Sequence, residues 1–289
     1  MIKQKTLIFF GAHPDDETFG MGSTLAQYAA SGVKVYCACS TRGEVGTVEP
    51  ELLKGYASIA DRRTEELKCA AEVLGLAGVI HLNYRDSGMR GTPDNKHPDC
   101  LAMAPIEDVT AKMVKVIREL KPDVVVTHSA GGGGYDHPDH NATHNAAVAA
   151  FYAANDAKQY PEAGPAFQPS KLYFLVRPRG MTRLTIMLMR LYGQDPRRAG
   201  RNRDIDFTRR ANVEFPIHAV FRLKKQSILI RNKAAACHSS QGGGQLRRGP
   251  FRIVRIIERI RGRADRDFFM REYPPPTKRR EKDLFEGLI

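Results

Sequence analysis

The chain has 289 residues, 42% of them hydrophobic, which is enough for one large α/β domain or for a catalytic domain with an extension. No apolar run approaches the ~20 residues that a membrane-spanning helix needs. The net charge of +13 is uneven: residues 1–170 carry 16 basic and 21 acidic residues, whereas residues 171–289 carry 29 and 11. The basic part therefore indicates either an anionic partner or a solubilising surface.

The N-terminal sequence and the cysteines indicate a cytoplasmic protein. MIKQKTLIFFGAH has a short apolar run but no small-residue cleavage site, so we predict a first strand there and no signal peptide. The cysteines are odd in number and lack paired spacing, which fits a reducing cytoplasm. They are Cys37, Cys39, Cys69, Cys100 and Cys237. Cys37 and Cys39 alternate along a predicted strand, and we expect both to be packing residues.

Strand-like and helix-like segments alternate in the first half of the chain. Apolar runs predict strands buried on both faces at 6–12, 33–40, 79–83 and 123–128. Helical patterns lie between and after them at about 19–31, 59–77, 106–120 and 141–154. The alternation predicts a doubly wound, mainly parallel, Rossmann-like sheet flanked by helices. In such a sheet, ligands bind beyond the carboxyl ends of the strands.

The pattern weakens after Phe174. Residues 177–210 are rich in Arg, Gly and Asp around the apolar piece LTIMLMRLY, and helical character returns near 219–237. In 251–263, four isoleucines fall on one helix face and three arginines on another. We therefore predict a catalytic α/β core (1–176), a basic insertion with a core-completing helix (177–245) and a basic C-terminal extension (246–289).

The stretch GAHPDDETFG at residues 11–20 follows the first predicted strand and holds a histidine and three consecutive acids. Like charges side by side are costly unless a cation sits among them. His13 and Asp16 are three residues apart on a tight turn, so their side chains can converge on a metal ion such as Zn²⁺. A third ligand is then expected from another strand end.

The segment GGGGYDHPDHNATH, residues 131–144, follows the predicted strand at 123–128 and offers three candidates for that ligand. His140 and His144 are four residues apart and could share a helix face. His137 and His140 flank Pro138-Asp139 and would lie in the loop and at the helix start. Asp139 has a simpler alternative role as the N-cap of the helix that follows.

AHPDDE followed by HPDH resembles the PIG-L/LmbE-like family of zinc-dependent N-deacetylases, which act on acetylated amino sugars and related glycoconjugates. TRGEVG (41–46), RRTEEL (62–67), YRDSGM (84–89) and KAAACHSSQ (233–241) agree with it. The resemblance covers most of the chain through about residue 241. Within the family, the sequence is most similar to the branch of the mycothiol-pathway deacetylase and the related conjugate amidase.

The resemblance implies a role for each residue of the two motifs. His13, Asp16 and His140 become the ligands of Zn²⁺, or of another divalent ion such as Fe²⁺. Asp15 becomes the general base for the attacking water. Tyr135 and His137 lie beside the substrate carbonyl, where a hydroxyl and an imidazolium would stabilise the oxyanion and help protonate the leaving amine. His144 is left as a structural histidine.

The resemblance also assigns four residues to the sugar pocket: Arg42, Glu44, Arg63 and Asp86. The alternative for Arg63 is an exposed helix charge. Glu17 either holds the loop by hydrogen bonds or is an ordinary acid at a helix N-terminus. His238 belongs to a family motif without an assignable role, and four further histidines are expected to be structural or exposed: His81, His97, His128 and His218.

The predicted function is removal of an N-acetyl or other N-acyl group from an amino-sugar glycoconjugate such as an N-acetylglucosaminyl-inositol. The alternatives are an amidase of a thiol-sugar conjugate, and a basic protein that binds anionic surfaces and has a non-catalytic metal site. The predicted loop at 84–103 would shape the pocket mouth. The helix at 251–263 would fit an anionic membrane. We expect no nucleic acid, because aromatic residues are not interleaved with the basic ones, and the resemblance allows a homo-oligomer.

Overall fold

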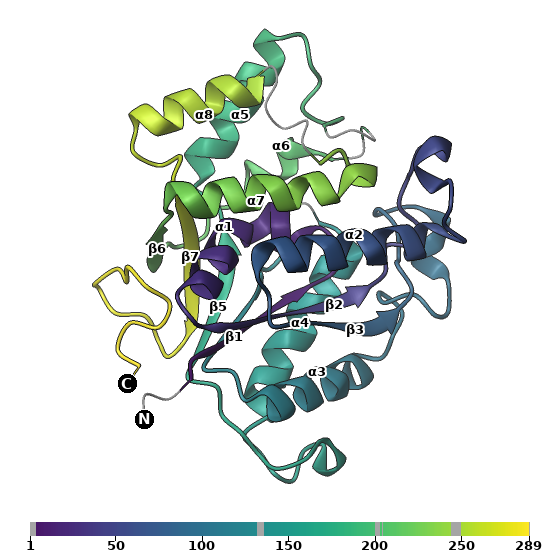
Figure 1. Ribbon diagram of the computed structural model, residues 1–289, viewed down its shortest axis with the longest axis vertical. Coiled ribbons are helices and arrows are strands. Elements are labelled where there is room, and N and C mark those ends of the chain that lie inside the picture. Colours follow the sequence, from purple (N-terminus) through teal and green to yellow (C-terminus); the bar gives the residue numbers. More distant parts are fainter. Residues whose placement is uncertain (1–3, 132–135, 200–202, 204, 244–249, 289) are drawn as a thin grey trace.

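The computed structural model describes residues 4–131, 136–199, 203, 205–243 and 250–288 (Figure 1). Its described strands form one seven-stranded sheet in the order β3-β2-β1-β4-β5-β7-β6. The first five strands are parallel: β1 (Thr6–Gly11), β2 (Lys34–Thr41), β3 (Gly78–Tyr84), β4 (Val124–His128) and β5 (Lys171–Val176). β7 (Arg266–Tyr273) and β6 (Ala219–Arg222) are antiparallel additions at one edge. The predicted doubly wound, mainly parallel sheet is confirmed.

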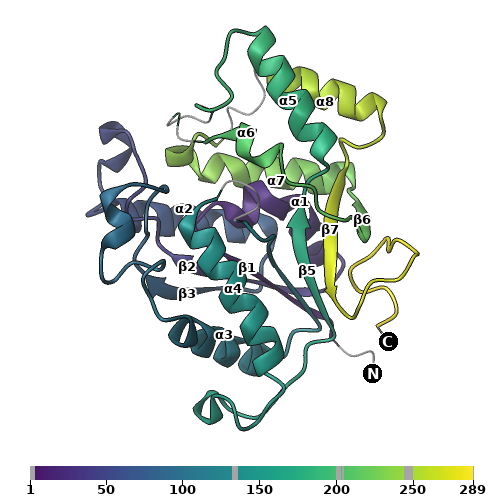
Figure 2. The ribbon, with the colours of Figure 1, turned by 180° about the vertical axis from the view of Figure 1, so that it is seen from behind.

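Helices cover both faces of the sheet (Figures 1 and 2). One face carries α1 (Asp16–Ala30), α2 (Ile59–Leu74) and α7 (Lys225–Cys237), and the other carries α3 (Ile106–Leu120) and α4 (Pro138–Ala153). Successive β1 side chains enter opposite layers: Leu7 and Phe9 pack with α1, while Ile8 and Phe10 pack with α3 and α4. Burial on both faces explains why β1 reads as an unbroken apolar run.

Local signals place the helix ends close to their predicted positions. Ser58 caps α2, since its side chain accepts a hydrogen bond from the Asp61 backbone N–H, and Gly75 ends this helix in a left-handed conformation.

The carboxyl ends of β1 and β4 lie side by side, and the starts of α1 and α4 lie next to them. β1 pairs with β2 on one side and β4 on the other, so the chain changes direction here, as at a Rossmann-type binding crevice.

The last third of the chain completes the same sheet. Residues 219–222 form strand β6, so the predicted helical character near 219–237 is wrong for its first part and holds for α7. LTIMLMRLY lies in α5 (Arg179–Leu191), which packs with α8 (Pro250–Ile260) at one end of the molecule (Figure 1). The remaining helical pieces are short: α6 (Phe207–Arg210), η1 (Pro50–Leu53), η2 (Pro93–Lys96), η4 (Pro161–Ala163) and η5 (Ser239–Gln241). β5 pairs with β7 across the predicted boundary at 176, and the division into three regions stays a prediction.

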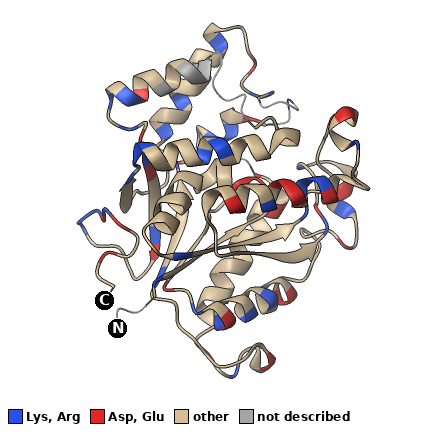
Figure 3. Cartoon of the chain, viewed as in Figure 1, with Lys and Arg blue, Asp and Glu red and all other residues tan. Residues whose placement is uncertain are grey.

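The charge asymmetry of the sequence is visible in the fold. Figure 3 shows basic segments on α7 and α8, whereas α2 carries several acidic ones.

Among the described residues, no helix combines the length and the apolar character that crossing a bilayer requires.

The expectation that the cysteines are all reduced is wrong for two of them. Cys69 on α2 and Cys237 at the end of α7 form a disulfide, with their Cα atoms 5.8 Å apart. They are 168 residues apart in sequence, so no local spacing reveals the pair. Cys37 and Cys39 are free and buried, as predicted for packing residues. Cysteine usage therefore no longer supports a reducing compartment.

Candidate active site

Side chains from the ends of β1 and β4 converge at the crevice. His13 Nδ1 lies 3.2 Å from His140 Nε2, and His140 Nε2 lies 3.4 Å from Asp16 Oδ1. The other oxygen of this carboxylate, Asp16 Oδ2, lies 3.9 Å from His13 Nδ1. Two imidazoles and one carboxylate thus point their donor atoms at one spot, and the structure has a His/Asp site able to hold a metal ion.

The spacing of these atoms fits a divalent cation. Metal–nitrogen bonds of about 2.0–2.1 Å in a tetrahedral site place two donor atoms about 3.3 Å apart. Without a cation, a proton must separate the facing nitrogens of His13 and His140. Burial lowers the pKa of His13, but Asp139 and Asp86 outweigh this effect and raise it well above its usual value. A bound cation would take the place of that proton.

Asp139 supports His13 from behind. Its carboxylate lies 3.1 Å from His13 Nε2 and accepts a hydrogen bond of 2.9 Å from the Ser87 backbone N–H. The N-cap of α4 is His137, whose Nδ1 accepts from the Asp139 backbone N–H, so the N-cap role suggested for Asp139 is wrong. A carboxylate on the outer nitrogen of a histidine fixes the ring with its inner nitrogen toward the metal.

His128 is a second residue that the sequence analysis did not place at the site. Its Nε2 lies 3.3 Å from Asp16 Oδ2, and its ring stacks on His140 with centroids 4.0 Å apart. Burial raises the pKa of Asp16, but His140 and His128 outweigh it and hold this pKa well below its usual value. The sequence could have indicated this role through the position of His128, which ends β4 beside the carboxyl end of β1.

Asp15 stands beside the three donor residues in an unusual backbone conformation, with φ 134° and ψ −23°. Its backbone N–H donates to Glu17 Oε2 at 3.0 Å, and its carboxylate lies 3.3 Å from Arg63 Nη2. Burial raises the pKa of Asp15 to about 6, against the opposing effect of Arg63. The acid next to the metal site is therefore a better proton acceptor than an ordinary aspartate.

Arg63 is only 4% exposed, which excludes the alternative of an exposed helix charge. Besides Asp15, it donates to the carbonyl oxygens of Pro14 (2.8 Å) and Gly43 (3.3 Å). Gly43 has φ +70°, and a Cβ there would lie 2.1 Å from Arg63 Nη1. Only glycine lets the TRGEVG turn approach the guanidinium this closely.

The other residues predicted for the sugar pocket divide into two groups. Asp86 Oδ1 lies 3.7 Å from His13 Nε2, and the Asp86 backbone N–H donates to Glu44 Oε2 at 3.0 Å, so both acids border the site. Burial raises the pKa of Asp86, but His13 outweighs it and lowers this pKa overall. Arg42 instead pairs with Asp61 on α2 at 2.7 Å.

The predicted partners of the substrate carbonyl are only partly described. The His137 ring lies 4.6 Å from the His13 ring, and burial together with His13 lowers its pKa to about 3. This favours a neutral imidazole, in place of the expected imidazolium, with the proton on Nε2. Tyr135 lies outside the described residues. His144 Nδ1 bonds the His128 carbonyl at 2.8 Å, which confirms it as structural.

Comparison with known proteins fits this geometry. The PIG-L family, described as GlcNAc-PI de-N-acetylase, matches residues 8–151, which include both motifs. The 1D-myo-inositol 2-acetamido-2-deoxy-alpha-D-glucopyranoside deacetylase of Geodermatophilus obscurus is 40% identical over 204 residues, or 68% of this chain and 69% of that relative. The chain belongs to the PIG-L family. This family places the protein among hydrolases that act on acetamido groups.

Further comparisons agree with this membership. A deacetylase of the same name from Thermobifida fusca is 36% identical over 197 residues, covering 65% of this chain and 68% of the relative. Among solved structures, the N,N'-diacetylchitobiose deacetylase from Pyrococcus horikoshii superposes with a TM-score of 0.63 at 19% identity, covering 93% of this chain and 84% of that one. This last likeness shows the shared fold.

Proposed function

We propose that this PIG-L protein removes the N-acetyl group from an N-acetylglucosaminyl-inositol. The observation that carries the proposal is the convergence of the donor atoms of His13, Asp16 and His140 beside Asp15. The names of relatives at 36–40% identity supply the substrate class.

His13, Asp16 and His140 would hold Zn²⁺, which accepts two imidazoles and a carboxylate and leaves a position open; Fe²⁺ would accept the same donors. When bound, such an ion polarises the acetyl carbonyl and activates a water molecule. Asp139 keeps His13 oriented, and His128 flanks Asp16, so the donor set is supported on two sides.

Asp15 accepts the proton of the attacking water in this proposal. Its raised pKa makes the carboxylate a stronger base, and Arg63 keeps it ionised near neutral pH. The proton is then available to the leaving amine on the same side of the site. Water thus supplies one oxygen of the acetate and one hydrogen of the free amine.

His137 donates from Nε2 toward the oxygen that gains negative charge, since its Nδ1 already accepts the Asp139 backbone N–H. Tyr135, assigned by the family motif, would donate to the same oxygen. Asp86, Glu44 and Arg63, which the family motifs assign to the sugar pocket, would bind sugar hydroxyls. Arg42 would reach the sugar only after releasing Asp61.

The test measures free-amine release from N-acetylglucosamine, its inositol glycoside, acetylated chito-oligosaccharides and a thiol-sugar conjugate. Each is incubated with zinc-loaded protein, with chelated protein and with Asp15→Ala; Asp156→Ala, which changes an exposed acid after α4, is the matched control. We expect metal-dependent release from the inositol glycoside that Asp15→Ala loses and Asp156→Ala keeps. Release from the thiol-sugar conjugate alone would make the protein an amidase, and no release from zinc-bound protein would overturn the deacetylase.

The remaining expectations concern surroundings and location. On α8, Ile256 is 50% and Ile260 81% exposed next to the exposed Arg259, which favours contact with an anionic membrane. Salt-sensitive binding to phosphatidylserine vesicles would support this contact, and its absence would remove it. Assembly into homo-oligomers and a cytoplasmic location stay predictions.

A further inference from the structure

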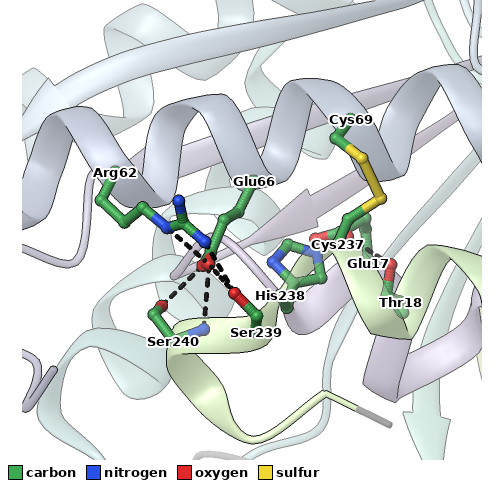
Figure 4. Close-up of a disulfide and its surroundings, with 9 residues drawn as sticks. All are labelled: Glu17, Thr18, Arg62, Glu66, Cys69, Cys237, His238, Ser239 and Ser240. Carbon is green, nitrogen blue, oxygen red and sulfur yellow. Dashed lines mark hydrogen bonds and ion pairs between the residues drawn. A yellow bond between two sulfur atoms is a disulfide. The ribbon is translucent and has the colours of Figure 1, made fainter. Parts of the chain in front are cut away.

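Next to Asp15, the side chains of Glu17 and His238 meet in the protein interior. His238 Nε2 lies 2.7 Å from Glu17 Oε1, and both side chains have no solvent exposure (Figure 4). Burial alone would lower the pKa of His238, but Glu17 outweighs it and raises this pKa above its usual value. The buried carboxylate of Glu17 therefore stabilises the protonated imidazole of His238.

Glu17 connects this pair to the active site. Its Oε1 faces His238, and its Oε2 accepts the backbone N–H of Asp15 at 3.0 Å. That N–H belongs to the residue with φ 134°, a conformation that persists only where surrounding contacts impose it. The hydrogen bond that the Asp15 N–H donates to Glu17 is such a contact, and it sets the direction in which the Asp15 side chain points.

The segment that carries His238 is tied to α2 by polar contacts. Glu66 on α2 accepts hydrogen bonds from Ser240 N (2.9 Å) and Ser240 Oγ (2.6 Å), and Ser239 Oγ donates to it as well (3.0 Å). The chain then turns back over the end of α7, where Gly243 N donates to the His238 carbonyl at 2.9 Å. A Cβ on Gly243 would lie 1.6 Å from the Ala235 carbonyl oxygen, so this turn requires glycine.

The disulfide provides a covalent tie at the residue before His238. Cys237 bonds to Cys69 on α2, one helical turn beyond Glu66 (Figure 4). The covalent bond and the Glu66 contacts hold the segment from both sides of His238. This arrangement leaves the imidazole little freedom to withdraw from Glu17.

We propose that His238 is a positioning residue for the reaction. It holds Glu17, and Glu17 in turn holds Asp15 in the orientation needed to accept the proton of water. The Cys69–Cys237 disulfide anchors His238. The inference rests on the proposed function for its catalytic consequence and on the contacts above for its structural one. Without His238, the buried Glu17 carboxylate lacks the ring that holds its Oε1, and its side chain has to turn. The Asp15 N–H then loses its acceptor.

The first experiment compares three variants of the zinc-loaded protein on the inositol glycoside. His238→Leu removes the partner of Glu17, His238→Gln places an amide N–H near the position of Nε2, and Ser240→Ala removes only an anchor to Glu66. We expect kcat to fall about 10²-fold for His238→Leu with KM and zinc content unchanged, since displacing a base by about 1 Å has this effect. His238→Gln should recover most of the loss. Ser240→Ala should keep kcat while lowering Tm, because the Ser240 N–H, Ser239 Oγ and the disulfide still tie the segment to α2.

The second experiment tests the anchor. A phosphine reductant and water convert the disulfide to two thiols and a phosphine oxide, and are applied in zinc-buffered solution to the wild type and to the double variant Cys69→Ser/Cys237→Ser. We expect kcat of the reduced wild type to fall several-fold to that of the double variant, which does not respond. An unchanged kcat in the fully reduced wild type overturns the role of the disulfide, as does an equal fall in the double variant.

A readout independent of activity separates this inference from the proposed function. Hydrogen exchange of the Asp15 amide, followed by NMR on deuterated protein, should be slow in the wild type and Ser240→Ala and faster in His238→Leu. Equal protection in all three proteins overturns the link from His238 to Asp15, as does a wild-type kcat in His238→Leu or an equal kcat loss in Ser240→Ala. If exchange responds but the wild type releases no amine, only the proposed function fails.

Discussion

Two of the buried groups of charged side chains that the structure describes are built differently. At the edge of the sheet, Glu281 lies between Lys171 Nζ (2.6 Å) and Arg271 Nη1 (2.7 Å), and it also accepts the Tyr173 hydroxyl (2.6 Å). At the crevice, by contrast, His13 and His140 face each other across 3.2 Å with Asp16 beside them. The first group pairs opposite charges, whereas the second brings together electron-pair donors.

The difference separates a structural cluster from a functional one. The carboxylate of Glu281 finds cationic and hydroxyl donors within the chain, so its burial is compensated without a ligand. The donors of the crevice are compensated only when a proton or a metal cation sits between them. Burial of charged side chains is common to both groups and does not distinguish them. They differ in which atoms face one another: a carboxylate and cations in the first group, and electron-pair donors alone in the second.

The sharpest test of this comparison removes one donor from the crevice. His140→Ala leaves two of the three proposed metal ligands, and we expect loss of bound zinc together with loss of at least about 10³-fold in kcat/KM, because both the polarised carbonyl and the activated water are lost. Metal analysis and amine release check this on the same sample. His144→Ala is the control, since the Nδ1 of His144 bonds the backbone carbonyl of His128 and this ring is not among the three donors; an equal loss of zinc there would contradict the assignment.

The next test keeps the donors and removes the neighbouring base. Asp15→Asn preserves the shape of the side chain and its contact with Arg63 but cannot accept a proton. We expect kcat to fall by about 10²–10⁴, the usual contribution of a general base, with zinc retained. Steady-state kinetics with metal analysis measure both quantities. A variant with more than a tenth of wild-type kcat and full zinc would remove Asp15 from the mechanism.

The Glu281 group should respond in the opposite way. Glu281→Ala leaves Lys171 and Arg271 as buried cations without their carboxylate, which destabilises a protein by about 3–5 kcal/mol. We expect a large decrease in the urea midpoint and an unchanged kcat for the folded fraction at low temperature. Glu286→Ala, which breaks the pair with the exposed Arg279, should change the midpoint much less. Loss of activity in folded Glu281→Ala would contradict a purely structural role for the Glu281 group.

Sequence patterns predicted the region around the crevice well because its determinants are local. The apolar runs and helix stops give β1, β2, β3 and β4 within a few residues, and the motifs at 13–16 and 137–140 follow strand ends. Parallel strands bring such ends to one edge of a sheet, so convergence of His13 with His140 was derivable. His128 and Asp139 were missed because their roles depend on which neighbour each side chain faces.

The C-terminal part was harder to predict because contacts distant in sequence determine it. Glu281 meets Lys171 across 110 residues, and Cys69 meets Cys237 across 168. β6 is four residues long and joins the sheet through β7, which itself follows a helix. No periodicity signals such pairings, and α8 additionally exposes two of its isoleucines where a core-facing helix would bury them.

The smallest expected effect concerns the His238–Glu17 pair, which resembles the Glu281 group in its charges but lies behind the crevice. Because the pKa of His238 is raised in the folded protein, the pair contributes its full stability below the unfolded histidine value of about 6.5 and loses it as the pH rises through the folded value. The difference in unfolding free energy between the wild type and His238→Gln should therefore be largest near pH 6 and shrink toward pH 9. Urea titrations across this range measure it, with Ser240→Ala as a control whose difference stays flat. A difference that grows with pH would mean that His238 is neutral in the folded protein, and Glu17 would then be held by hydrogen bonding alone.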